Sequence, residues 1–176
     1  ILKTLFPREA ANSYIKIVRI ACHYHEIFDI LPLTFWLREK GYEVGINLMQ
    51  ISEVNNERLR ILLSKLNNFP LSVFYFADSL GAMSNNNTEE ITKIIYQECN
   101  IPFGCHLHDN LGLALSNTLI CIKNGASWVD STISGMGRGP GNCKTEELLI
   151  EKKFLLHENS YDISSLLDLI NKYFTN

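Results

Sequence analysis

The chain has 176 residues, 46% of them hydrophobic and 20% charged, and this composition is typical of a soluble globular domain with a substantial core. A formal net charge of −3 without a cluster of Lys and Arg argues against binding to nucleic acid or to an anionic membrane. Runs of about 18 apolar residues, a signal-peptide stretch and Cys-x-x-Cys pairs are all missing, so we expect no membrane span, no disulfide framework and a reducing, cytoplasmic setting.

The first half of the chain alternates between predicted strands and predicted helices. β-Branched and aromatic residues indicate strands, and apolar residues spaced three or four apart indicate helices. The predicted strands cover residues 15–21, 43–49 and 71–77, and the predicted helices cover residues 30–40 and 55–66. Pro32 lies in the first turn of the first helix, where a missing N–H is harmless, and Gly41 ends that helix.

The second half continues the same alternation. A helix that is capped near Asn87 or Thr88 follows a polar loop at residues 78–84. The remaining elements are a strand at 102–108, a helix at 111–123, a strand at 128–133, a glycine-rich loop at 134–142, and helices at 145–156 and 162–173.

One strand and one helix recur about every 28 residues, which is the pattern of a βα repeat and of a parallel sheet. Two closures of such a sheet compete, the open doubly wound sheet and the eight-unit barrel. The length of the chain favours the open sheet, because a barrel typically needs ~250 residues. The loops favour the barrel, because polar residues follow every strand and a barrel gathers its strand ends around one axis. These polar residues are His23, His25, Asn47, Asp78, Ser79, His106, His108 and Asn142.

His106 and His108 are candidate metal ligands, because side chains two residues apart on a strand project from the same face. The alternative is a pair of hydrogen-bonded histidines in a polar barrel interior. Strand alternation turns Asp109 away from the pair, so we expect it to orient an imidazole or to start the following helix. Asn142 is the better third ligand, because it ends the glycine loop of the adjacent strand and offers a neutral carbonyl oxygen.

Each of the other polar features leaves two interpretations open. Asp78 and Ser79 either hydrogen-bond substrate oxygens or form an Asx-type turn. The glycine loop either binds a phosphate or is a tight loop whose backbone adopts the positive φ angles that glycine allows. It matches neither the Walker pattern nor the dinucleotide fingerprint. Arg138 either pairs with a substrate carboxylate or phosphate or is solvated. His23 and His25 either point into the site or are ordinary core or surface histidines.

Three segments occur together in an order that is typical of a known family. They are Ala-Asp-Ser-Leu-Gly-Ala-Met at 77–83, Gly-Cys-His-Leu-His-Asp-Asn-Leu-Gly-Leu-Ala at 104–114, and Val-Asp-Ser-Thr-Ile-Ser-Gly-Met-Gly-Arg-Gly-Pro-Gly-Asn at 129–142. The chain resembles the DRE-TIM metallolyases, also called HMGL-like, over residues 15–150, and most closely their 4-hydroxy-2-oxovalerate aldolase branch. The resemblance implies an α/β fold of the TIM-type (β/α)8 class, with about five βα units, units four to eight, in this chain. Residues 1–176 would then be the C-terminal portion of a single barrel domain.

The resemblance also implies the residues of a site. His106 and His108 would be ligands of a divalent metal, with Asn142 at or beside it, while Ser79, Asp78 and His106 would contact the substrate. Mn²⁺ or Mg²⁺ would suit an oxygen-rich shell, and two imidazoles also allow Zn²⁺. The family's acidic ligand, its neighbouring arginine and the histidine base of the aldolases belong to a first strand that does not occur here. We therefore expect the chain to be a fragment, with the general base outside it.

The expected function is that of a divalent-metal-dependent lyase, an aldolase that cleaves a 4-hydroxy-2-oxo acid to pyruvate, or a similar 2-oxo acid, and an aldehyde. Two alternatives stay open, an acyl-CoA condensing synthase of the isopropylmalate synthase type and a non-catalytic barrel that binds a ligand. The expected partners are a small-molecule 2-oxo acid and either a second copy of the chain or a partner enzyme, with no nucleic acid and no membrane.

Overall fold

The computed structural model describes residues 2–155 and 162–174, and within them five strands form one parallel sheet in the order β1-β2-β3-β4-β5. The strands are β1 (Ile17–Cys22), β2 (Glu43–Leu48), β3 (Val73–Asp78), β4 (Phe103–Leu107) and β5 (Trp128–Val129). The helices are α1 (Leu2–Leu5), α2 (Ile27–Glu39), α3 (Asn56–Leu66), α4 (Asn85–Glu98), α5 (Ala114–Lys123), α6 (Thr145–Leu155) and α7 (Ser164–Tyr173). None of these described helices is long and apolar enough to span a membrane.

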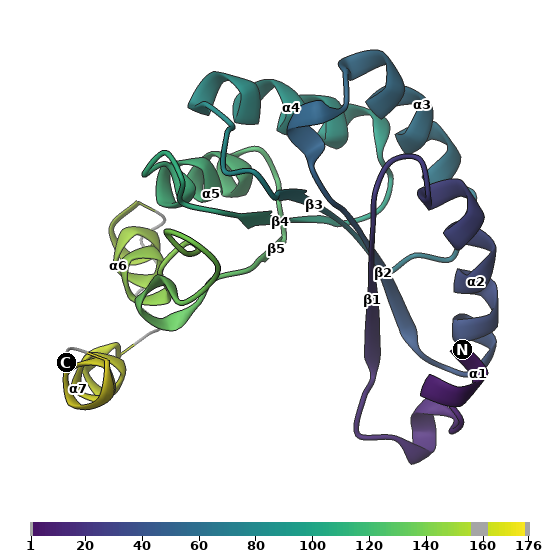
Figure 1. Ribbon diagram of the computed structural model, residues 1–176, viewed down its shortest axis with the longest axis horizontal. Coiled ribbons are helices and arrows are strands. Elements are labelled where there is room, and N and C mark those ends of the chain that lie inside the picture. Colours follow the sequence, from purple (N-terminus) through teal and green to yellow (C-terminus); the bar gives the residue numbers. More distant parts are fainter. Residues whose placement is uncertain (1, 156–161, 175–176) are drawn as a thin grey trace.

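The order of the strands decides between the two closures expected from the sequence. A doubly wound sheet reverses its strand order at a switch point and carries helices on both faces. Here each strand pairs with the next one along the chain, so right-handed crossovers place successive helices on the same face. Figure 1 shows α2, α3, α4, α5 and α6 in an arc around one side of the curved sheet. This is the arrangement of part of a TIM-type barrel, and the predicted fold class is confirmed.

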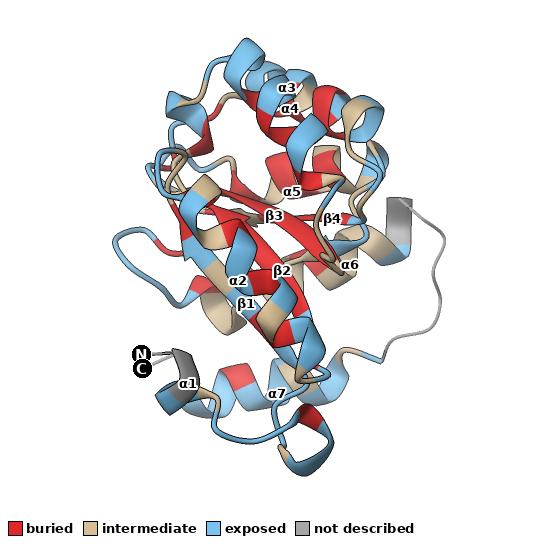
Figure 2. Cartoon of the chain, turned by 90° about the vertical axis from the view of Figure 1, so that its right-hand side faces the viewer, coloured by how far each residue is buried: buried red, intermediate tan, exposed pale blue. Residues whose placement is uncertain are grey.

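Side chains alternate between the two faces of each strand and so divide into two groups. The helix-facing group joins the leucines and isoleucines of α3 and α4 in one hydrophobic core, and Figure 2 shows how fully β2, β3 and β4 are buried. The strand residues in this group are Cys22, Ile46, Leu48, Phe74, Phe76, Phe103, Cys105 and Leu107. The alternate residues, among them Arg19, Tyr75 and His106, lie on the opposite face, which we call the inner face.

Two helices begin earlier than the sequence predicts. Helix α2 begins at Ile27, so Pro32 lies inside the helix and not in its first turn. Helix α4 begins directly after Ser84, whose Oγ accepts a hydrogen bond from the Asn87 N–H at 3.2 Å. The predicted cap at Asn87 or Thr88 is therefore wrong, because Ser84 satisfies a free N–H of the first turn.

Two elements near the histidines are shorter than predicted. Helix α5 begins at Ala114 and not at residue 111, because Asp109 Oδ1 accepts the Ala114 N–H at 2.9 Å and the chain before it forms a turn. Strand β5 ends at Val129, although it was predicted to continue to residue 133. Beyond it, Thr132 forms an isolated bridge with Lys144, which takes the chain out of the sheet.

Candidate active site

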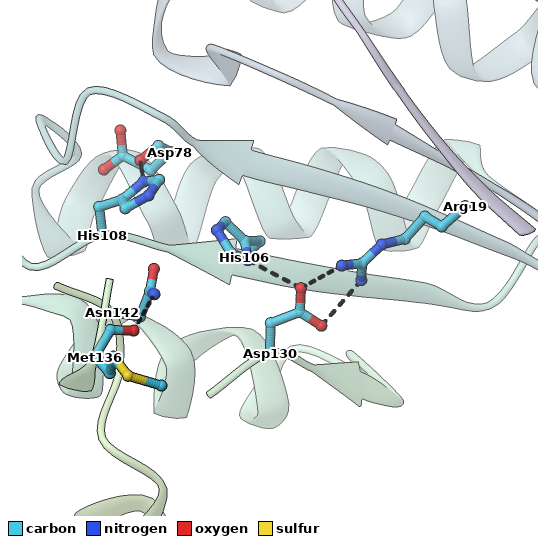
Figure 3. Close-up of polar contacts among 7 residues, drawn as sticks. All are labelled: Arg19, Asp78, His106, His108, Asp130, Met136 and Asn142. Carbon is cyan, nitrogen blue, oxygen red and sulfur yellow. Dashed lines mark hydrogen bonds and ion pairs between the residues drawn. The ribbon is translucent and has the colours of Figure 1, made fainter. Parts of the chain in front are cut away.

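His106 and His108 project from the inner face at the C-terminal end of β4, as the spacing predicts, with ring centroids 5.1 Å apart. His106 Nδ1 lies 2.9 Å from Asp130 Oδ2, and His108 Nδ1 lies 2.9 Å from the carbonyl oxygen of Asp78 (Figure 3). A carboxylate and a carbonyl accept hydrogen bonds only, so each neutral imidazole carries its proton on Nδ1. Each Nε2 then keeps a free lone pair, and neither has a hydrogen-bond partner in the described part of the chain.

Asn142 comes to the histidines through an isolated antiparallel bridge between its backbone and that of His108. Its side-chain Nδ2 donates to the carbonyl oxygen of Met136 at 3.0 Å (Figure 3). The Oδ1 atom of the same amide is buried and accepts no hydrogen bond from the described residues. A buried amide oxygen without a donor costs free energy, so Asn142 Oδ1 is available to a hydrogen-bond donor or a cation that the described residues do not provide.

The donor set fits a divalent metal. Two imidazole Nε2 atoms and the Asn142 Oδ1 atom lie at the same end of the sheet without a partner among the described residues, and these atom types bind divalent metals in proteins. Among residues 2–155 and 162–174, no cluster of three or more His, Cys, Asp or Glu side chains forms around the pair. The acidic ligand that the resemblance implies, on a strand outside the chain, stays a prediction.

Asp130 links the histidines to the inner face below them. Arg19 donates to Asp130 Oδ1 and Oδ2 at 2.9 and 2.6 Å, and its guanidinium lies 4.1 Å from the centre of the Tyr75 ring. Burial acts to raise the pKa of Asp130, but the hydrogen bonds from His106 and Arg19 and the charge of Arg19 outweigh burial and lower this pKa to about 2. Burial also raises the pKa of Tyr75, and its phenol stays neutral. Asp130 is therefore an anion that holds the His106 ring in place.

The layer formed by Arg19, Tyr75 and Asp130 was not predicted from the sequence. It needs space that Gly104 provides, because a Cβ at this position would lie 2.7 Å from the Tyr75 ring and 2.8 Å from the Trp128 Cβ. One signal for the layer was present, since Arg19 is the single charged residue in the strand Ile17–Cys22. A charged side chain on the interior face of a barrel strand would need a partner, although Arg19 itself is exposed in this structure.

Asp78 holds its own loop together. Its carboxylate is buried and accepts the N–H groups of Ala82 at 3.1 Å and Met83 at 2.9 Å, which is the turn that the sequence analysis gave as one alternative. Its carbonyl oxygen accepts the bond from His108 Nδ1. A substrate contact of the Asp78 side chain stays a prediction.

Ser79 lies next along this loop. Its Oγ accepts the backbone N–H of Gln50 at 3.1 Å, and Gln50 has a positive φ of 53°. A non-glycine residue in this region is uncommon and often marks a functional loop. The Ser79 O–H itself stays free to donate to a bound molecule.

The glycine loop wraps around Asn142 and is tied to the end of β4. Gly141 has a φ of 96°, and a Cβ there would lie 1.9 Å from the Gly135 carbonyl oxygen, so the loop has the positive φ that one interpretation required. The Gly141 carbonyl accepts the Asp109 N–H at 2.9 Å. The Arg138 side chain crosses to the neighbouring loop and donates to the Ser79 carbonyl at 2.9 Å.

Two further predicted residues, His23 and His25, contact each other, as His106 and His108 do. His23 and His25 follow β1 with their rings stacked, the centroids being 5.7 Å apart. They line a pocket of about 250 Å³ together with Gln50 and Arg58. Within the described residues they form no metal-binding group with other His, Cys, Asp or Glu side chains.

Comparisons with known proteins agree with this geometry. The family model described as HMGL-like matches residues 11–172. The 4-hydroxy-2-oxovalerate aldolase of Pelotomaculum thermopropionicum is 35% identical over 162 residues, which are 92% of this chain and 48% of that protein. The 4-hydroxy-2-oxovalerate aldolase 2 of Rhodococcus opacus is 30% identical over 161 residues, 92% of this chain and 46% of that protein. The chain thus spans about half the length of the curated relatives it matches.

Solved structures show the same fold. The N-terminal domain of an aldolase candidate from Bacteroides vulgatus superposes with a TM-score of 0.75 at 31% identity, covering 90% of this chain and 55% of that one. The hydroxymethylglutaryl-CoA lyase of Pseudomonas aeruginosa superposes with a TM-score of 0.76 at 18% identity, covering 95% of this chain and 66% of that one. At that identity, the second match supports the barrel fold alone.

Proposed function

The chain belongs to the HMGL-like family, and on this basis we propose that it carries the metal-binding part of a carbon–carbon lyase. The substrate is a 4-hydroxy-2-oxo acid, and the products are pyruvate, or a similar 2-oxo acid, and an aldehyde. Relatives named as aldolases support the reaction class, and the arrangement around His106 and His108 supports a metal-dependent mechanism.

One observation carries the proposal most directly. At the C-terminal end of the sheet, where TIM barrels place their active sites, three atoms have no partner in the part of the chain that the structure describes: Nε2 of His106, Nε2 of His108 and the buried Oδ1 of Asn142. These three atoms would hold the metal together with an acidic ligand from outside this chain. Mn²⁺ or Mg²⁺ is favoured because the remaining ligands would be oxygens, and the imidazoles also admit Zn²⁺.

The reaction breaks the bond between C3 and C4 of the substrate. The proton of the 4-hydroxyl group goes to a base, C4 becomes the aldehyde carbon, and C3 keeps the electron pair and later takes up a proton. When bound, the metal supplies Lewis-acid chemistry that stabilises the negative charge developing on the 2-oxo group. The base is expected outside this chain, as the sequence analysis predicted.

The residues of this chain bind and orient. The Ser79 O–H donates to an oxygen of the 2-oxo acid, while the Gln50 N–H fixes the position of Oγ from the other side. Asp130 and the Asp78 carbonyl hold the two imidazoles so that Nε2, and not Nδ1, faces the site. Preorganised side chains of this kind spare the reorganisation that would otherwise slow the chemical step.

Two measurements on the full-length protein test this proposal: Mn²⁺ binding by calorimetry and pyruvate release from 4-hydroxy-2-oxovalerate. We expect His106→Ala and Asn142→Ala to weaken both, with His106→Ala lowering kcat/KM at least ~100-fold because a metal ligand is lost. Asn68→Ala is the matched control, because Asn68 is exposed beyond α3, at the opposite end of the sheet from the histidines.

The outcome also separates the alternatives. Thiol release that depends on acetyl-CoA would identify an acyl-CoA condensing synthase instead. Binding of a 2-oxo acid without turnover would identify a non-catalytic barrel. A wild-type protein that binds none of Mn²⁺, Mg²⁺ and Zn²⁺ and releases no pyruvate would refute the proposed function.

A further inference from the structure

Arg138, which forms no ion pair with the residues that the structure describes, places a positive charge beside the candidate active site. We propose that Arg138 is an anion-binding residue of this site and that it hydrogen-bonds a carboxylate or phosphate group of the substrate. The inference rests on the proposed function, because it takes the substrate to be an acid that is held next to Ser79.

Two successive carbonyl groups anchor Arg138 close to the metal-binding pair. His108 Nδ1 donates to the Asp78 oxygen, and Arg138 Nη2 donates to the Ser79 oxygen, each at 2.9 Å. Because consecutive Cα atoms are only ~3.8 Å apart, the imidazole and the guanidinium are fixed to neighbouring points of one loop. The same loop carries the Ser79 hydroxyl that is proposed to contact the 2-oxo acid.

Within residues 137–141 of the glycine loop, Arg138 is the single polar side chain. Between Met136 and Asn142, residues 137–141 contain only glycine and proline besides Arg138. The backbone of this loop is fixed by the bond from Asn142 Nδ2 to the Met136 carbonyl at 3.0 Å and by a turn from the Gly141 N–H to the Arg138 carbonyl at 3.2 Å. The constrained backbone of the loop therefore positions one cationic group, the Arg138 guanidinium, next to Ser79.

The Arg138 guanidinium has more hydrogen-bond donors than its one protein acceptor uses. It carries five N–H groups, and a single carbonyl accepts from one of its nitrogens. Among the described residues no carboxylate pairs with Arg138, whereas Arg19 and Arg60 each form an ion pair with one. The Arg138 side chain is exposed, so its charge and its remaining N–H groups are accessible to a ligand.

The chemistry of the ligand follows from the planar fork of the guanidinium, which matches the paired oxygens of a carboxylate or phosphate. A 4-hydroxy-2-oxo acid always brings one such group, its C1 carboxylate. It brings a second when the aldehyde half carries an acid or a phosphate. Both sources present the same chemistry to Arg138, and its contact with the Ser79 carbonyl favours the C1 carboxylate.

The test uses Arg138→Gln in the full-length protein and two 4-hydroxy-2-oxo acids, one ending in a methyl group and one in a carboxylate. Calorimetry with pyruvate in the presence of Mn²⁺ adds a readout that does not depend on turnover. Hydrogen bonds to a charged group typically correspond to ~10- to 100-fold in affinity. We therefore expect a loss of that size in kcat/KM, and an intermediate loss for Arg138→Lys, which keeps the charge without the fork.

Arg60→Gln is the control, because it removes an exposed arginine from the outer surface of α3. A loss with both substrates together with weaker pyruvate binding supports the C1 carboxylate as the anion. A loss confined to the carboxylate-ended substrate supports an anion in the aldehyde half. If Arg138→Gln cleaves both substrates and binds pyruvate like the wild type, the inference is overturned while the aldolase proposal stands. If the wild type cleaves neither substrate, both are overturned.

Discussion

His106 takes its orientation from Asp130, a residue that lies on another strand end 24 positions along the chain. The same carboxylate also accepts hydrogen bonds from both terminal nitrogens of Arg19, so His106 and Arg19 together fix its position. Carboxylates that orient a metal-binding histidine raise its basicity and reduce the rotational freedom that it loses on binding. Asp130 is therefore expected to matter for the affinity of the proposed metal site, although its own carboxylate is held by His106 and Arg19.

Replacing Asp130 by Asn tests this role. We expect Asp130→Asn to weaken Mn²⁺ binding ~10- to 100-fold, because the amide is neutral and leaves Arg19 without its partner. Calorimetric titration of the full-length protein measures the effect. Asp168→Asn, an exposed change on α7, is the control. Equal affinities for the wild type and Asp130→Asn would show that the hydrogen bond to His106 is structurally incidental.

For single residues, the sequence predicted the direction of side chains on a strand better than it predicted which side chains form ion pairs. The i, i+2 rule of a strand predicted that His106 and His108 share one face, and it turned Asp109 away to the start of α5. The role of Asp130 was missed because its partner Arg19 lies 111 positions away, and no local pattern connects the two. The ligand roles of the histidines and Asn142 stay predictions until metal binding is measured.

At the scale of elements, β4 packs so closely against its neighbours that its glycine has a steric role. The aromatic ring of Tyr75 lies over Gly104, and Trp128 stands on the other side. Gly104 thereby lets Arg19 stack on Tyr75 below the histidines.

A Cβ at Gly104 is expected to destabilise the fold. Gly104→Ala should lower the free energy of unfolding by ~1–3 kcal/mol, because a methyl group 2.7 Å from the Tyr75 ring overpacks the inner face. Urea denaturation followed by circular dichroism measures the change. Gly112→Ala separates space from backbone strain, because its Cβ would meet no atom within 4 Å while its φ is 69°. Equal losses for the two variants would contradict the packing argument.

Sequence patterns predicted which elements exist better than where they end. The cores of the strands and helices follow from apolar periodicity, which is a local property. Their ends depend on hydrogen bonds made by individual side chains, such as Ser84 at α4 and Asp109 at α5. Strand β5 was predicted too long because its β-branched residues favour a strand, while the bridge from Thr132 to Lys144 draws the chain elsewhere.

On the scale of the whole molecule, the ion pair between Arg19 and Asp130 connects β1 with the chain after β5, at opposite edges of the sheet. The two can meet only because the sheet curls toward its inner face, as in Figure 1. The choice between an open sheet and a barrel could not be made from length, and it was the recurring polar strand ends and the family motifs that favoured the barrel correctly.

This ion pair predicts how stability depends on pH. The pKa of Asp130 is lowered to about 2 from 3.8, so its contribution is complete above pH 4 and is lost as the pH falls from 4 toward 2. The shift corresponds to ~1–2 kcal/mol once partial exposure is considered. Urea midpoints at pH 7, 4 and 2.5 should show the advantage of the wild type over Asp130→Asn shrinking across this window. A constant advantage at all three values would contradict the assignment.

The close approach of Gly141 to Gly135 sets how freely this loop can vary during evolution. Any side chain at 141 would overlap the Gly135 carbonyl, whereas a Cβ at Gly139 would meet no atom within 4 Å and its φ of 62° suits asparagine and aspartate. A library randomised at both positions and selected for folded protein should therefore return only glycine at 141 but several residues at 139. The loop beside Arg138 would then combine one position closed to substitution with one at which related enzymes can diverge.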